Sequence, residues 1–152
     1  MKINIVAVGK IKEKFFLDAI AEYSKRLSKF CEFKIIEVNE ASNYKNLSEK
    51  NEIEGKLLLS KCKGVIIALD RCGKMLSSED LANVISDNMM SGGSEISFII
   101  GGSNGISDEV KNNAKLLISF GKITFPHQLF RVVLSEQIYR AFSIINGMPY
   151  HK

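Results

Sequence analysis

Apolar residues follow two different periods along the chain, and together these periods predict a series of strands and helices. Residues 2–8 alternate and then run apolar up to Gly9, which predicts a strand that ends there. From Phe16 to Phe30 apolar residues recur every three to four positions, which predicts a helix over 13–29 with lysines on its outer face. Similar patterns predict strands at 33–38, 65–70, 96–101 and 116–120, and helices at 47–61, 79–90, 108–115 and 127–146.

Local sequence chemistry supports several of these helix ends. Ser77, with Asp80 three residues later, has the pattern of a capping box. Ser107 is followed by two acidic residues, which are favourable at the positive end of a helix dipole. Pro126 suits the first position of the last helix, and Gly147 suits its stop.

Strands that alternate with helices indicate βαβ units. We therefore predict the α/β class, with a mostly parallel sheet covered by helices on both faces. The sequence has neither a repeat nor an obvious linker, so residues 1–152 are expected to form one domain. A composition of 45% apolar and 25% charged residues fits a compact core and excludes a disordered tail or a disulfide-stapled miniprotein.

The last predicted helix is apolar around most of its circumference, because eleven of the seventeen residues from Leu129 to Ile145 are apolar. Such a helix must be covered on more than one side. The sheet covers one side. A second subunit or a neighbouring element of the same chain can cover the other, and the sequence favours neither.

The apolar runs, the N-terminal pattern and the cysteines predict where in the cell the protein works and whether its thiols are reduced. The apolar runs are far shorter than the roughly 20 residues of a membrane-spanning helix, and a strand-like pattern rather than a signal peptide follows Met1. We therefore expect a cytoplasmic protein without a membrane partner. Cys31, Cys62 and Cys72 are widely spaced, which predicts reduced thiols rather than a disulfide framework or a zinc site.

The net charge of +4 is spread unevenly. Residues 10–34 carry seven basic against four acidic groups, and 121–152 carry four against one. Basic ends are compatible with an anionic partner such as nucleic acid. A solvated, lysine-rich helix gives the same count.

Three predicted strands in succession lead into turns that contain glycine, at 69–74, 101–105 and 120–122. Ligands of open parallel sheets bind outside the carboxyl ends of the strands, where glycine permits close approach of the backbone. The three turns therefore predict one shared pocket. The alternative is that each glycine serves only its own turn.

The glycine pattern also excludes some ligand classes. Neither the dinucleotide fingerprint G-x-G-x-x-G nor a P-loop occurs, so a phosphate cradle is disfavoured. A ligand held by backbone groups and apolar contacts fits better, as an adenosyl group with a methionine tail requires. We expect no metal, because His127 and His151 are the only histidines and neither has a ligand at metal-binding spacing.

The carboxyl end gathers the remaining candidates for chemistry, namely His127, Arg131, Arg140, Tyr150, His151 and Lys152. Arg131 and Arg140 are nine residues apart, about half a turn out of phase on a helix, so they cannot serve one site. Arg140 also follows Glu136 by four residues, which suits a helical ion pair. For the tail 148–152, fraying is the alternative.

These residues resemble a known family over essentially the whole chain, the bacterial large-subunit ribosomal RNA pseudouridine-N3 methyltransferases of the SPOUT superfamily. The motifs that carry the resemblance are Val6-Ala7-Val8-Gly9-Lys10, Leu69-Asp70 with Gly73-Lys74-Met75-Leu76-Ser77-Ser78-Glu79, Phe98-Ile99-Ile100-Gly101-Gly102-Ser103-Asn104-Gly105, Thr124-Phe125-Pro126-His127-Gln128, Arg131-Val132-Val133-Leu134, Glu136-Gln137, Tyr139-Arg140-Ala141 and Pro149-Tyr150-His151-Lys152.

The resemblance implies a C-terminal trefoil knot, a homodimer and S-adenosyl-L-methionine as cofactor. It assigns the cofactor contacts to Leu69, Gly101, Phe120, Gly121, Lys122, Ile123, Thr124 and Phe125. It makes Arg140, Tyr150 and His151 the catalytic candidates that hold the target nucleotide, with His127 and Arg131 as further candidates.

The implied reaction is methylation of pseudouridine N3 in 23S rRNA of the assembled ribosome. His151, or a group that it positions, would assist loss of the N3 proton, and Arg140 would stabilise the developing charge or anchor a phosphate. We expect two subunits to form the RNA footprint. The rival function is a non-catalytic α/β module that binds a nucleotide or flavin, or a ribosome-associated adaptor; methylation of another RNA position is a third.

Overall fold

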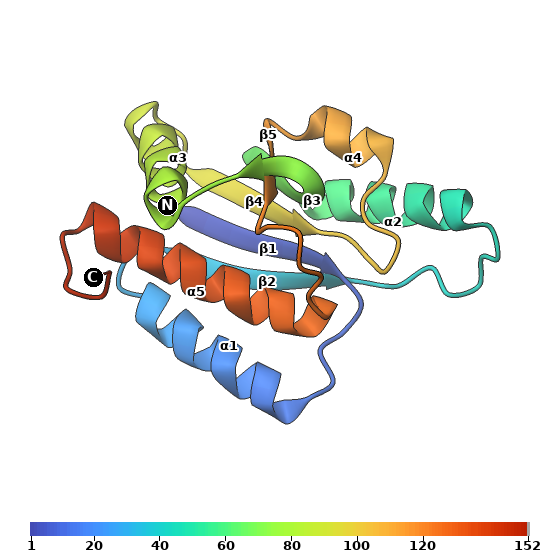
Figure 1. Cartoon of the computed structure of the whole chain (residues 1–152), viewed down its shortest axis with the longest axis horizontal. Coiled ribbons are helices and arrows are strands. Elements are labelled where there is room, and N and C mark those ends of the chain that lie inside the picture. The colour runs from blue at the N-terminus through green and yellow to red at the C-terminus, as the bar shows by residue number, and fades with distance from the viewer. Residues whose placement is uncertain (152) are drawn as a thin grey trace.

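The structure, a computed structural model, describes residues 1–151, so Lys152 of the C-terminal motif lies outside the described residues. Strands and helices alternate along the chain (Figure 1). In order they are β1 (Lys2–Val8), α1 (Lys14–Leu27), β2 (Glu32–Val38), α2 (Leu47–Lys61), β3 (Val65–Met75), α3 (Ser78–Met90), β4 (Glu95–Ile100), α4 (Asp108–Asn113), β5 (Leu116–Ser119) and α5 (His127–Ile145).

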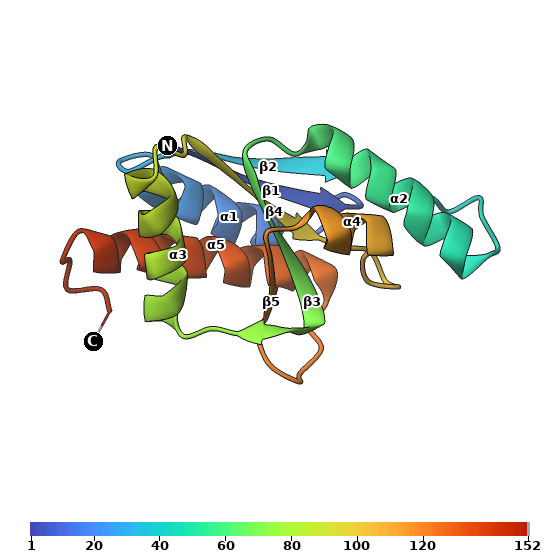
Figure 2. The ribbon, with the colours of Figure 1, turned by 90° about the horizontal axis from the view of Figure 1, so that it is seen from above.

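The sheet has the strand order β2-β1-β4-β3-β5, and all its strand pairs are parallel. The predicted parallel sheet with helices on both faces is confirmed. Side chains of β1 alternate between two cores: Ile5 faces the layer of α1, α3 and α5, and Val6 faces the layer of α2 and α4. Figures 1 and 2 show α1 beside α5, with α2 and α4 across the sheet from them.

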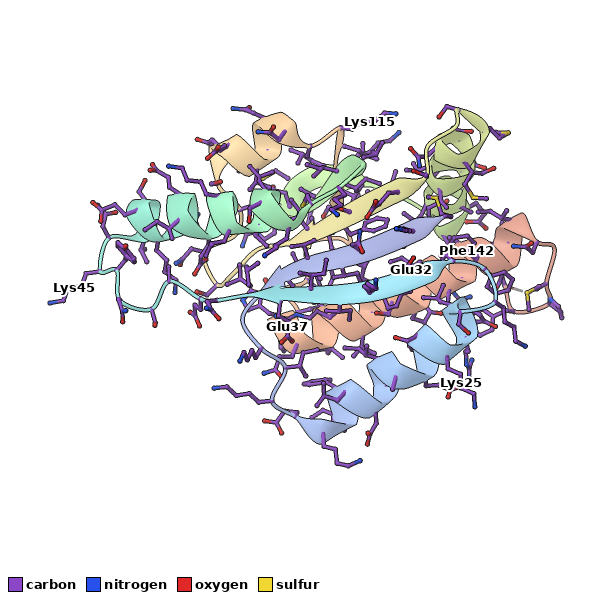
Figure 3. All side chains as sticks on the ribbon, turned by 180° about the vertical axis from the view of Figure 1, so that it is seen from behind. Lys25, Glu32, Glu37, Lys45, Lys115 and Phe142 are labelled. Atoms are coloured by element: carbon purple, nitrogen blue, oxygen red, sulfur yellow. The ribbon has the colours of Figure 1, made fainter. Side chains whose placement is uncertain are left out.

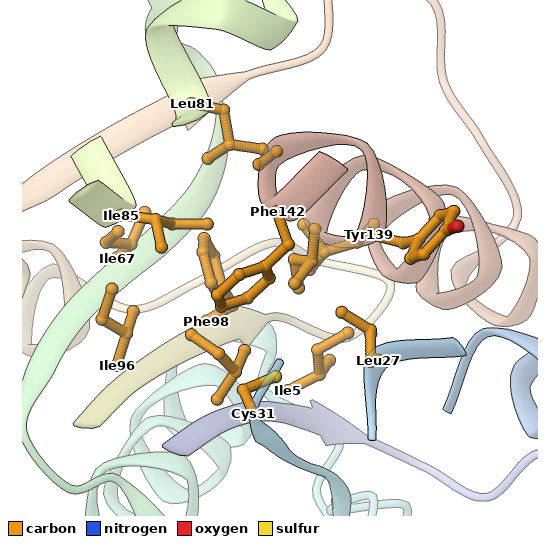
Figure 4. Close-up of a cluster of buried hydrophobic side chains, with 14 of the residues drawn as sticks. Ile5, Leu27, Cys31, Ile67, Leu81, Ile85, Ile96, Phe98, Tyr139 and Phe142 are labelled. Atoms are coloured by element: carbon orange, nitrogen blue, oxygen red, sulfur yellow. The ribbon is translucent and has the colours of Figure 1, made fainter. Parts of the chain in front are cut away.

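The larger core lies beneath α5. Phe98 of β4 and Phe142 of α5 are fully buried at its centre, together with Leu27 of α1 and Leu81 of α3 (Figure 4). Helices α1 and α3 both pack against α5. Elements of the same chain therefore cover both flanks of α5, and a half-buried outer stripe remains, formed by Leu129, Val132, Val133, Glu136, Gln137 and Arg140.

Most of the predicted helix ends are confirmed. Ser77 and Asp80 form the reciprocal hydrogen bonds of a capping box, and the Ser107 hydroxyl accepts from the Val110 N–H at 3.3 Å. Gly147 adopts a φ of 62°, and the Met148 N–H donates to the Ser143 carbonyl, which closes α5. Pro126 is the N-cap of α5 rather than its first residue, so its predicted position was wrong by one.

Strand β3 is longer than predicted. The sequence predicts its end at Asp70, whereas the strand continues to Met75 after an irregularity between Leu69 and Lys74. Gly73 explains the continuation, because a Cβ at this residue would lie 2.7 Å from backbone atoms of β5. The glycine lets the two backbones touch and the strand resume. Helix α4 is shorter than predicted and ends at Asn113.

Within residues 1–151, none of the helices is both long enough and apolar enough to cross a membrane. The three cysteines are free thiols, as predicted. Burial raises the pKa of Cys31 and of Cys62 to about 11, so both stay protonated at neutral pH. Cys72 is exposed.

Candidate active site

One pocket of about 500 Å³ opens at the carboxyl ends of β4 and β5, beside the irregularity of β3 that follows Leu69. The segments 69–72, 100–106 and 118–121 line it, and the chain from Ile123 to Phe125 closes it together with His127 and Phe130 of α5. The predicted sharing of one crevice is therefore confirmed for the turns at 101–105 and 120–122, which follow neighbouring parts of a parallel sheet. Residues 69–72 line the crevice too, but they belong to strand β3 rather than to a turn, and Gly73 is not in the lining.

The turn after β4 brings the backbone itself to the pocket. A Cβ on Gly101 would lie 2.3 Å from the Gly105 carbonyl oxygen, so only glycine allows this fold of the chain. Gly105, with a φ of 79°, donates its N–H to the Gly102 carbonyl at 3.0 Å. The result is a tight turn without side chains at its base, which suits a ligand held by peptide groups.

A buried carboxylate lies behind this turn, and sequence reasoning missed it. Glu54 of α2 is 2% exposed, and its Oε1 accepts from the Ala41 N–H at 3.0 Å. A Cβ on Gly102 would lie 2.7 Å from Glu54 Oε2. Asn51, one turn earlier on α2, donates from Nδ2 to the Asn104 carbonyl at 3.1 Å. The signal in the sequence is a glutamate on the inward face of a helix, next to a glycine.

Aromatic rings build the apolar wall of the pocket. Phe130 of α5 meets Phe120 edge to face, with centroids 5.1 Å apart, and stacks on Phe125 at 5.5 Å. Gly121 follows Phe120 and has a φ of 102°. Its N–H donates a hydrogen bond to the Ser119 hydroxyl at 3.2 Å. Such pairs fix ring positions, which gives a rigid surface for a flat ligand.

Opposite charges stand at the edge of the same pocket. Lys111 Nζ of α4 lies 3.4 Å from Asp70 Oδ2 at the irregularity of β3. Asp70 Oδ1 accepts from the Cys72 N–H at 2.8 Å, so this carboxylate is held in one orientation. Arg71 lines the pocket as well.

The residues to which the resemblance assigns the cofactor are nearly all in this pocket. Its walls include Leu69, Gly101, Phe120, Gly121, Ile123, Thr124 and Phe125. Lys122, the remaining member of that set, does not line it. Their role toward a cofactor stays a prediction.

The C-terminal tail packs back onto α5. The Tyr150 hydroxyl donates to Glu136 Oε1 at 3.0 Å, and Arg140 Nε donates to the same oxygen at 3.0 Å. The predicted ion pair between Arg140 and Glu136 is thus confirmed. His151 Nε2 lies 2.7 Å from Glu79 Oε1. Fraying of residues 148–151 is therefore wrong as an interpretation.

The tail and the pocket lie at opposite ends of α5. His127 begins the helix at the pocket, and Arg140 is thirteen residues further, about 20 Å at 1.5 Å per residue. The structure brings Arg140, Tyr150 and His151 together, yet it does not bring them to the pocket of the same chain.

Arg131 is excluded from substrate contact by its burial. Its side chain is 1% exposed and donates to the Val8 and Gly9 carbonyls at 2.6 and 2.9 Å. It also pairs with Glu37 at 3.0 Å, a residue labelled at the end of β2 in Figure 3. The prediction that Arg131 is a candidate nucleotide ligand was wrong, because its guanidinium ties α5 to the ends of β1 and β2. Arg131 and Arg140 serve different places, as their spacing predicted.

Across the described part of the chain, no group of three or more His, Cys, Asp and Glu side chains is placed to hold a metal ion. The pocket instead offers peptide groups, aromatic rings and a few charges, which is a site for an organic ligand.

A parallel sheet with a pocket at its carboxyl edge places the chain among the open α/β proteins, which bind their ligands at that edge. Residues 1–151 match the family described as "Predicted SPOUT methyltransferase". The chain therefore belongs to the SPOUT methyltransferase family.

Relatives and a solved structure agree with this membership. The chain is 52% identical to "Ribosomal RNA large subunit methyltransferase H" of Clostridium novyi (strain NT) and 51% identical to the protein of that name from Clostridium botulinum (strain Okra / Type B1), with 100% of each chain covered. Its fold is similar to that of a probable methylase family protein from Haemophilus influenzae Rd KW20, with a TM-score of 0.58. At 10% identity, over 99% of this chain and 70% of that one, this likeness concerns the fold alone.

Proposed function

We propose that the chain transfers a methyl group from S-adenosyl-L-methionine to large-subunit ribosomal RNA, at N3 of a pseudouridine in the assembled ribosome. The observation that carries the proposal is the pocket in which the glycine-bearing turns at 101–105 and 120–121 meet residues 69–72 of β3. Family membership supports methyl transfer, and the names of the relatives support the RNA substrate.

The pocket suits the methyl donor in size and chemistry. Its volume of about 500 Å³ lies within the range of small-molecule sites. Phe120 and Phe125 offer a flat apolar surface for the adenine, and the bare peptide groups of Gly101 and Gly121 offer hydrogen bonds. When bound, the donor supplies a methyl group already activated by the sulfonium. The protein then has to orient the nucleotide, exclude water and receive a proton.

A homodimer is part of the proposal, because one chain leaves its tail and its pocket apart. The residues Leu129, Val132 and Val133 on α5 are apolar and only half-buried, so part of this stripe is exposed to solvent in a single chain. Two such helices packed antiparallel about a two-fold axis would set the tail of one subunit beside the pocket of the other. The active site would then be composite.

His151 is suited to receive the N3 proton. Arg140 Nη1 lies 3.4 Å from His151 Nδ1. Because a guanidinium nitrogen can only donate hydrogen bonds, Nδ1 is the acceptor in this contact. Nε2 then carries the hydrogen and donates to Glu79. The lone pair of Nδ1 is engaged by Arg140, so the guanidinium has to release it before Nδ1 can accept the N3 proton. The released Arg140 cation would then stabilise the anionic imide of the nucleotide.

Two further features belong to this proposal. Residues 1–152 form one domain with a C-terminal trefoil knot, as the family resemblance implies. The protein works in the cytoplasm, where its ribosomal substrate is.

Calorimetry with S-adenosyl-L-methionine, FMN and ATP tests the proposed function. Selective binding of the first is expected, whereas selective binding of FMN or ATP would favour the non-catalytic module. Product analysis tests the target, on ribosomes that come from a strain lacking the protein and are then incubated with the purified protein and S-adenosyl-L-methionine. A methyl group at pseudouridine N3 is expected, and methylation elsewhere would contradict the assigned position.

A further inference from the structure

We propose that Asp70 and Lys111 together recognise the amino-acid end of the methyl donor, with Lys111 Nζ binding its carboxylate and Asp70 Oδ2 its ammonium group. The inference rests on the proposed function and adds to it two residues that the family resemblance does not assign. It concerns donor selection rather than the methyl transfer step.

The first argument is the distribution of charge in the pocket. The donor has an uncharged adenosine end and a zwitterionic end, and the pocket is divided in the same way. Phe120, Phe125 and Phe130 form one wall, while Asp70 and Lys111 lie where β3 meets α4. Adenosine on the aromatic wall leaves the zwitterion for the charged edge.

The second argument is the geometry of the pair. At 3.4 Å, Lys111 Nζ and Asp70 Oδ2 are further apart than the 2.7–2.9 Å typical of a tight charge-assisted hydrogen bond. Asp70 Oδ1 is occupied by the Cys72 N–H, which leaves Oδ2 directed at the pocket edge. A zwitterion replaces this loose contact by two ion pairs and leaves no charge without a partner.

The third argument is that the backbone is fixed at both residues and that the Asp70 side chain is fixed as well. Asp70 is 14% exposed and fixed by its hydrogen bond. Lys111 sits on α4, and its N–H donates to the Ser107 carbonyl at 3.1 Å in the first turn after the cap. Little rotational freedom of the backbone is lost when a ligand binds between them.

The test compares two ligands that differ only at the end in question. S-Adenosyl-L-homocysteine carries the adenosine, the sulfur and the amino acid, whereas 5′-methylthioadenosine lacks the amino acid. For Lys111→Met and for Asp70→Asn we expect affinity for the first ligand to fall about tenfold, the size of one charge-assisted contact. Affinity for the second ligand should change less than twofold.

Two controls separate charge from fold. Lys111→Arg keeps the charge and should retain most of the affinity for S-adenosyl-L-homocysteine. Lys115→Met removes a lysine on the exposed surface after α4, labelled in Figure 3, and should leave both affinities unchanged.

The outcomes are distinct. Equal losses for both ligands would mean that the pair only shapes the pocket, and unchanged binding in both variants would mean that the zwitterion lies elsewhere; either result overturns the inference. If the wild-type chain binds neither ligand, the proposed function itself fails.

Discussion

The Tyr150 hydroxyl and Glu136 Oε1 are 3.0 Å apart, although fourteen residues separate them in the chain. Glu136 thus receives hydrogen bonds from both the tail and Arg140, and the Tyr150 ring lies 4.8 Å from the Arg140 guanidinium carbon. One carboxylate on α5 therefore organises the residues that we assign to the target nucleotide. The tail has a defined position within a single chain, before any RNA binds.

Replacing the Glu136 carboxylate should lower the turnover of ribosome methylation without changing the affinity for the methyl donor. In Glu136→Gln the amide still accepts one hydrogen bond, but it no longer attracts the Arg140 cation. We expect kcat for ribosome methylation to fall at least tenfold, with donor affinity unchanged, because Glu136 does not line the donor pocket. Steady-state kinetics and calorimetry check this. Loss of donor affinity with unchanged kcat would contradict it.

Tyr150 should make stability depend on alkaline pH. Burial, reinforced by the hydrogen bond to Glu136, raises the pKa of Tyr150 to about 12 from its usual 10. The folded state holds this proton more tightly than the unfolded chain, so the contribution is complete below pH 10 and is lost as pH rises from 10 through 12. Tyr150→Phe should cost about 1 kcal/mol at pH 8, the value of one hydrogen bond. Denaturant unfolding at pH 8, 10 and 11 should show the two proteins converging as pH rises.

Arg131 and Arg140 should respond differently to substitution. Arg131→Met removes the donor to two buried carbonyls and to Glu37, which should destabilise the fold by about 2–4 kcal/mol. Arg140→Met leaves these contacts intact and should lower turnover with a much smaller loss of stability. Denaturant unfolding checks this prediction, because the midpoint of Arg131→Met should be clearly lower than that of Arg140→Met. Equal midpoints for the two variants would refute the structural role of Arg131.

The sequence predicted the parallel sheet, both helical layers and the meeting of the turns after β4 and β5 in one pocket. These features follow from local pattern and from the geometry of parallel strands. It did not predict that β3 continues past Asp70. That continuation depends on Gly73 touching the backbone of β5, a contact between segments more than 40 residues apart.

Side-chain roles were harder to predict than elements. A buried arginine such as Arg131 looks the same in a sequence as one that binds RNA, because burial depends on partners elsewhere in the chain. Glu54 was missed for the same reason, since its partners Ala41 and Gly102 come from two other loops. The position of the C-terminal tail also depends on a residue far away in the sequence, because His151 contacts Glu79 of α3.

Gly102 leaves little room for a side chain. In Gly102→Ala the added Cβ would lie 2.7 Å from Glu54 Oε2. Because Glu54 is buried and held by the Ala41 N–H, we expect the turn to give way together with the carboxylate. We expect donor affinity to fall about tenfold, as a displacement of the binding backbone implies. Gly102→Ala combined with Glu54→Asp, which withdraws the carboxylate by one methylene group, should recover part of the loss. Gly92→Ala strains a backbone with a φ of 82° outside the pocket, so it is the control for general destabilisation.

Mixed dimers give the sharpest test of a composite site. His151→Ala removes the proposed proton acceptor, and Gly101→Val blocks the pocket, because a Cβ there would meet the Gly105 backbone. Each variant alone should be nearly inactive on ribosomes. If tail and pocket act across the interface, a heterodimer of the two variants keeps one intact site, in which the unaltered tail of one subunit meets the unaltered pocket of the other. Random mixing should then restore about a quarter of wild-type activity, since half of the dimers are mixed and each has one working site of two. Should the mixture stay inactive after subunit exchange has been verified by mass spectrometry, tail and pocket of the same chain work together and the shared site is wrong.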